Sequence, residues 1–161
     1  MPKISSRAST LISLILAVTL VVFIFLMMVL MPLFIDKAPL LSHIRSWFAE
    51  KDAVLGISGT TVFWVWAYAV MAVAECCCIA MVFLLFRVRR SLVFSPITVS
   101  LIRFVSWGCL LIALLCMLVV YHFHMSYMIA LAAAFLGITV RVVKNVIEEA
   151  TAIKSENDLT V

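Results

Sequence analysis

The sequence predicts an all-α integral membrane protein with four transmembrane helices in an up-down bundle. Of its 161 residues, 66% are hydrophobic and only 12% are charged, whereas about half of the residues of a soluble domain are apolar. Four apolar runs, at about 11–35, 59–86, 104–121 and 127–147, are long enough to cross a hydrocarbon core of ~30 Å as helices. We therefore expect residues 1–161 to form a single membrane domain.

Basic residues predict the orientation of these helices. With the N-terminus placed inside, nine of the twelve Lys and Arg residues fall in inner segments, against Lys37, Arg45 and Lys51 outside. The positive-inside rule then places both termini in the cytoplasm. The formal net charge of +4 is explained by this topology, so the sequence gives no reason to expect direct nucleic-acid binding.

The first apolar run, residues 11–35, follows the basic residues Lys3 and Arg7, as the apolar region of a signal peptide does. A cleaved signal peptide has a shorter apolar region of about 7–15 residues. We interpret this run as a retained signal-anchor helix.

The outer segment, residues 36–58, predicts a short helix on the membrane surface. Apolar residues recur in it at roughly helical spacing, with polar residues between them: Leu40, Leu41, Ile44, Trp47 and Phe48. Two interpretations remain open, a connector whose apolar side rests on the bundle, and a ligand-sensing or lid element.

The inner loop, residues 87–103, contains a helix-start pattern. Arg87, Arg89 and Arg90 end the second helix at the headgroups. Ser95 followed by Pro96 is typical of a helix N-terminus, because serine caps free amides and proline tolerates the first helical position. We expect the third helix to begin at Pro96 and to enter the bilayer near Arg103.

The fourth helix is predicted to lie beside the third and to continue into a cytoplasmic tail at 148–161. The outer turn, 122–126, is so short that the two helices must be adjacent and antiparallel. An apolar stripe then continues beyond the membrane at three- and four-residue spacing, over Val142, Val143, Val146, Ile147, Ala150 and Ile153. Such a stripe needs to be covered by the bundle, the lipid surface or a partner helix.

Glu75 is the strongest internal candidate for function. It precedes Arg87 by twelve residues and so lies ~18 Å deep, where a charged residue costs roughly 2.5–3.5 kcal/mol on insertion. Arg141 is the nearest plausible basic partner in depth. Either Glu75 fixes helix packing, neutral or paired, or it is a proton-coupled or ligand-binding carboxylate.

The cysteines and histidines favour structural interpretations. Cys76, Cys77, Cys78, Cys109 and Cys116 all fall inside predicted membrane helices, where packing is expected rather than redox or metal chemistry. His122 and His124 are expected to be interfacial turn residues. A metal pair, completed by His43, and a pH-sensing role are the alternatives.

Motifs for catalysis are not found in this sequence. It contains neither a phosphate-cradling glycine loop nor a nucleophile elbow nor an H-E-x-x-H pattern. We expect no enzyme, no cofactor and no metal.

Two segments resemble a known family. Phe94-Ser95-Pro96, followed by Val99, Ile102-Arg103 and Trp107, resembles the inner-loop motif of the YoaS-like family of small four-helix bacterial membrane proteins of unknown function. The final residues, Glu156, Asn157, Asp158, Leu159, Thr160 and Val161, resemble the ending of the same family. The resemblance implies a multi-pass protein of the bacterial cytoplasmic membrane.

The resemblance also implies a partner, because members are often encoded beside a small helix-turn-helix regulator. The chain would then be a membrane-bound sensor or anti-regulator that docks this cytoplasmic regulator. The docking residues would be Phe94, Ser95, Pro96, Arg103 and residues 156–161. A second interpretation of the tail is a solvated end that keeps the last helix from sliding into the membrane.

An alternative function rests on Glu75. The chain would be a small transporter, channel subunit or immunity-type protein that uses this intramembrane carboxylate. Four helices hardly enclose a pore, so this alternative expects a homo-oligomer.

Overall fold

The computed structural model describes residues 6–35, 37–50, 58–90 and 95–159, with side chains described from residue 11 to residue 153. The described residues form the helices α1 (Ser6–Phe34), α2 (Pro39–Glu50), α3 (Gly59–Arg89), α4 (Pro96–Leu118) and α5 (Ser126–Leu159). Four of them, α1, α3, α4 and α5, are long and apolar enough to cross a membrane. The all-helical class and the four candidate spans are thus confirmed, as expected of a multi-pass membrane protein.

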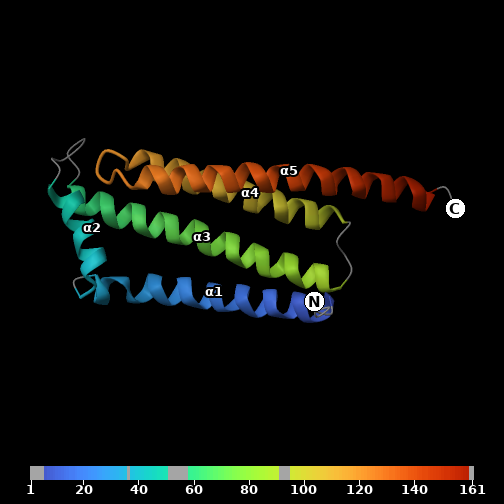
Figure 1. Ribbon diagram of the computed structural model, residues 1–161, viewed down its shortest axis with the longest axis horizontal. Helices are drawn as coiled ribbons and strands as arrows, with labels where there is room; N and C mark the ends of the chain where they lie inside the picture. Colours follow the sequence, from blue (N-terminus) through green and yellow to red (C-terminus); the bar gives the residue numbers. More distant parts are fainter. Residues whose placement is uncertain (1–5, 36, 51–57, 91–94, 160–161) are drawn as a thin grey trace, which may run out of the picture.

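The four long helices alternate in direction and pack as a row in chain order (Figure 1). Among the described residues, α1 packs on α3, α3 on α4 and α4 on α5, while α2 packs on α3. Helix α1 begins and α5 ends at the same end of the row, which we call the terminal end. The opposite end, where α2 and the α4–α5 turn lie, is called the α2 end. This row arrangement is a detail that the sequence did not predict.

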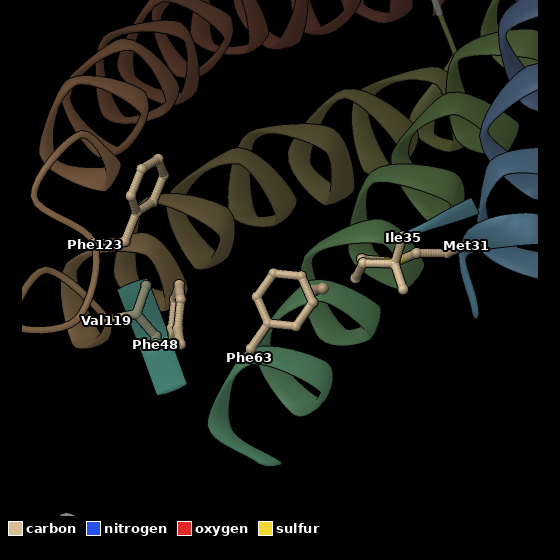
Figure 2. Close-up of a cluster of buried hydrophobic side chains, with 7 residues drawn as sticks. Met31, Ile35, Phe48, Phe63, Val119 and Phe123 are labelled. Carbon is tan, nitrogen blue, oxygen red and sulfur yellow. The ribbon is translucent and has the colours of Figure 1, made fainter. Parts of the chain in front are cut away.

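An apolar cluster holds the α2 end together. Figure 2 shows Phe48, Phe63, Val119 and Phe123 gathered from α2, α3 and the α4–α5 turn, with Met31 and Ile35 at the end of α1. Phe48 is fully buried, and its ring centroid lies 5.4 Å from that of Phe63 in an edge-on arrangement. Such edge-to-face pairs add to the stabilisation that burial provides. Helix α2 therefore rests on the row through Leu41, Ile44 and Phe48, as the connector interpretation expects, whereas Leu40 of the predicted apolar side is 72% exposed.

Gly59 allows the start of α3 to approach the backbone of α2. A Cβ at this position would overlap the carbonyl oxygen of Phe48. The helix starts there because Ser58 caps it, its hydroxyl accepting a hydrogen bond from the Thr61 amide at 3.4 Å. The glycine is therefore required by the α2–α3 contact.

Two serines join α4 to α5. The Ser106 hydroxyl donates to the carbonyl of Gly137 at 2.9 Å, and the Ser126 hydroxyl donates to that of Cys116 at 2.6 Å. A Cβ on Gly137 would lie 3.0 Å from Leu110, so the two helices approach closely there. Small residues and interhelical hydrogen bonds are the usual means by which membrane helices associate.

The helix bounds agree with the sequence at most positions. Helix α4 begins at Pro96 and α2 covers the predicted amphipathic segment. Helix α4 ends at Leu118, however, so Tyr121 lies in the turn and not at a helix end. The apolar run continues past the end of the helix because Val119, the C-cap residue, is buried in the apolar cluster.

Candidate functional site

The predicted docking residues that the structure describes lie at the terminal end. There, Arg87 joins the end of α3 to the start of α4 through two hydrogen bonds. Its Nε donates to the Thr98 hydroxyl at 3.2 Å, and its Nη2 donates to the Ser95 hydroxyl at 2.8 Å. Ser95 is the N-cap of α4 and accepts from the Thr98 amide at 3.4 Å, while Pro96 occupies the first turn. This confirms the predicted helix start and shows that a basic side chain braces it.

Arg103, which we predicted as a docking residue, forms an ion pair within the chain. Its Nη2 lies 3.3 Å from Glu148 Oε1, which joins α4 to α5. Lys144, one turn before Glu148 on the same helix, donates to the other carboxylate oxygen. The Arg103 and Glu148 side chains are about half exposed, so both are accessible to a partner.

Arg141 lies against an aromatic ring of the neighbouring helix. Its guanidinium carbon is 5.1 Å from the ring centroid of Trp107, within the range of a cation–π interaction. A small cavity of about 50 Å³ between α4 and α5 is lined by Arg103, Ser106, Trp107, Arg141 and Lys144. Three basic side chains therefore surround one point between these helices.

Glu75 and Arg141 are not brought together. Helix α4 lies between α3, which carries Glu75, and α5, which carries Arg141. The Glu75 Oε2 atom is buried and has no hydrogen-bond partner. Arg141, the nearest plausible partner in depth, is therefore not placed to pair with Glu75, because depth along a helix says nothing about which helices are neighbours.

The extension of α5 presents its apolar stripe outward. Val142, Val143, Val146 and Ile153 are each 48–62% exposed, and Ile147 and Ala150 are partly covered. The backbone of 156–159 continues the helix, but the side chains of these residues lie outside the described part. Phe94, Thr160 and Val161 lie wholly outside it.

The histidines lie in three different environments at the α2 end. His122 is buried and stacks on Phe48, with ring centroids 5.4 Å apart and ring planes 9° apart, and neither ring nitrogen has a hydrogen-bond partner. His43 is exposed and lies against Trp47, and His124 is exposed. Among the described residues, no three His, Cys, Asp or Glu side chains are placed to hold a metal ion.

The cysteines lie along α3 and α4 as free thiols. Cys77 packs so closely on α4 that a Cβ on Gly108 would overlap its sulfur. This contact is the small-residue packing that the sequence favoured.

Two features of the terminal end were missed in the sequence. The Lys144–Glu148 pair has the four-residue spacing that stabilises helices, so this spacing could have revealed it. The cavity beside Arg87 and Arg90, of about 410 Å³, depends on how α3 meets α4 and has no comparable pattern in the sequence.

Compared with known proteins, the chain matches no family model, no curated protein and no solved structure. The resemblance to the YoaS-like family therefore stays a prediction.

Proposed function

We propose that this chain is a bacterial inner-membrane sensor or anti-regulator that docks a cytoplasmic regulator of the helix-turn-helix type at its terminal end. The observation that carries the proposal is the outward apolar stripe on an α5 that extends past the other helices (Figure 1). The assignment of this end to the cytoplasm rests on the distribution of basic residues.

The length of α5 supports a role outside the membrane. Its 34 residues span ~51 Å, whereas the hydrocarbon core is ~30 Å thick. Roughly 20 Å of helix is thus left for the interface and the cytoplasm. Ile153, in this part of the helix, is 57% exposed and has the apolar character that a partner helix would cover.

The start of α4 lies at the same end and offers a second docking element. Arg103 and Glu148 form an exposed ion pair, and such pairs contribute little to stability. A charged side chain of a partner could therefore replace Arg103 or Glu148 in this pair at a small cost in free energy. Docking through α5 and the start of α4 would let a change within the membrane alter the release of the regulator.

Site-specific photocross-linking in cells tests this proposal. A photoreactive residue at Ile153 is expected to capture a small DNA-binding protein, whereas one at Phe135, an exposed α5 residue within the apolar span, should capture none. The chain shortened to end at Lys154 should fold normally and lose the capture. If the regulator is captured equally from Phe135, or if nothing is captured from a folded full-length chain, the proposal fails.

A second candidate, a small transporter or channel subunit, is favoured by the unpartnered oxygen of Glu75. An open row of helices would enclose a path only as a homo-oligomer. Replacing Glu75→Gln should then abolish flux in liposomes, while Glu149→Gln, outside the apolar runs, should not. Full flux with Glu75→Gln excludes a proton-carrying carboxylate.

A further inference from the structure

The cavity at the terminal end of the α3–α4 contact combines two cations with an apolar wall. It has a volume of about 410 Å³ and is lined by Phe83, Phe86, Arg87, Arg90, Ile97 and Leu101. The bonds from Arg87 to Ser95 and Thr98 fix its guanidinium in place, and they use two of its five N–H donors. Arg90, at the C-cap of α3, supplies the second charge.

A second cavity, of about 430 Å³, lies farther from the terminal end than the first one. It is almost wholly apolar, and its lining includes Val73, Cys76, Phe104, Gly108 and Leu111. It lies between the same two helices, α3 and α4.

The linings of the two cavities lie along one face of α3 and one face of α4, and we call the line on which both cavities lie the α3–α4 seam. On α4, Ile97, Leu101, Phe104, Gly108 and Leu111 follow one another at alternating four- and three-residue spacing. On α3, the apolar Val73 and Cys76 lie on the same face as the Arg87 and Arg90 that line the head of the seam.

The length of the seam fits one membrane leaflet. Arg87 follows the apolar run of α3, at the level expected for lipid headgroups, and Ala72, the lining residue of the second cavity farthest from it on α3, lies fifteen residues earlier. Fifteen helical residues cover ~22 Å, about half of a bilayer that is ~40–45 Å thick with its headgroups. The apolar side chains Phe83, Ile97 and Phe104 are more than half exposed, so the seam opens toward the surrounding lipid.

We propose that the α3–α4 seam is a binding site for an anionic phospholipid. Its phosphate would lie at Arg87 and Arg90, and one of its acyl chains would lie along the apolar part of the seam. The positive charges of Arg87 and Arg90 complement a phosphate, and the apolar part of the seam is long enough for an acyl chain that spans one leaflet. Arginine is well suited to this role because its planar fork bonds two phosphate oxygens at once. The site stands apart from the docking of a regulator, since it would hold a lipid whether or not a partner binds.

Native mass spectrometry of the purified full-length chain tests the site, with phosphatidylglycerol, phosphatidylcholine of the same acyl chains, and inorganic phosphate as probes. We expect the anionic lipid to bind at least about fivefold more tightly than the zwitterionic one. Arg90→Gln should weaken this binding about fivefold, the loss of ~1 kcal/mol expected for one cation near an anionic headgroup. Arg89→Gln removes the same charge from the same helix end, outside the cavity lining, and should leave binding unchanged.

A second pair of variants tests the apolar part of the seam independently of charge. Leu101→Trp fills the seam and should weaken phosphatidylglycerol binding, whereas Met117→Trp, at an exposed position of α4 outside the seam, should not. Equal losses in Arg89→Gln and Arg90→Gln, or unchanged binding in Leu101→Trp, would overturn the proposal. So would displacement of the lipid by millimolar inorganic phosphate, which would show a simple anion site. Circular dichroism of each variant confirms that it is folded.

Discussion

The two ends of this molecule are held together by different forces. At the α2 end, Phe48 and Phe63 join α2 to α3 in a buried apolar cluster. At the terminal end, arginines bridge neighbouring helices through hydroxyls and carboxylates, as Arg87 does with Ser95 and Arg103 with Glu148. The cluster closes one end, while the polar bridges leave cavities and an exposed helix stripe at the other. The α2 end is thus closed by burial, and both proposed binding sites lie at the terminal end.

The largest effect is expected from Phe48→Ala at the α2 end. Removing a fully buried phenylalanine typically costs about 3–5 kcal/mol, here by opening a cavity between α2, α3 and the α4–α5 turn. Reversible unfolding in mixed detergent micelles measures this loss. Leu40→Ala, at a 72% exposed position of the same helix, is the control and should change stability little. Equal losses would show that the cluster is not what holds this end.

At the terminal end, Arg87→Gln should destabilise the chain by about 1.5–3 kcal/mol, because it removes charged hydrogen bonds to Ser95 and Thr98. The same unfolding measurement is compared with Arg89→Gln, an exposed position at the same helix end, which should stay within about 0.5 kcal/mol of the parent. If the two variants behave alike, Arg87 does not brace the start of α4.

His122→Phe should stabilise the α2 end by about 1 kcal/mol. Phenylalanine keeps a ring against Phe48 and removes two buried nitrogens that have no partner. A rise in melting temperature is expected, with no change for His124→Phe at the exposed neighbouring position. A fall in melting temperature would show that the His122 nitrogens make a contact that stabilises the turn.

The smallest effect is expected from Glu148→Gln, which removes the ion pairs that this half-exposed carboxylate makes with Arg103 and Lys144. Such pairs are weak and screened by salt. The difference from the parent should be slight at low salt and vanish at about 1 M salt, where the Debye length is ~3 Å. A large loss that persists at high salt would mean that the terminal end depends on these pairs as strongly as the α2 end depends on its cluster.

Much of the fold could be read from short stretches of sequence. Apolar run length predicted the four spans, and the Ser95-Pro96 pair predicted the start of α4. The spacing of apolar residues predicted α2 and the continuation of α5. These features depend on residues that are near one another along the chain, which is why they can be predicted from a single sequence.

The candidate site could be predicted only in part. The sequence indicated which residues lie toward the terminal end, Arg103 and Ser95 among them, but it could name Arg141 as a plausible partner of Glu75 only from depth. In the structure, Arg141 lies over Trp107 and helix α4 separates it from Glu75. Depth in the membrane follows from position along one helix, whereas neighbours across helices depend on the order in which helices pack.

The sequence by itself determined that this chain has four helices fit to cross a membrane, one short amphipathic helix and a fourth span that continues as a long helix. Only the tertiary structure decided that the helices form a row, that His122 is buried beside Phe48, and that Arg87 and Arg90 line one cavity. The physical reason is that helix formation follows from local hydrogen bonding and apolar run length. Contacts between helices instead depend on close approach at a few small residues, such as Gly59, Gly108 and Gly137, whose partners lie far away in the sequence.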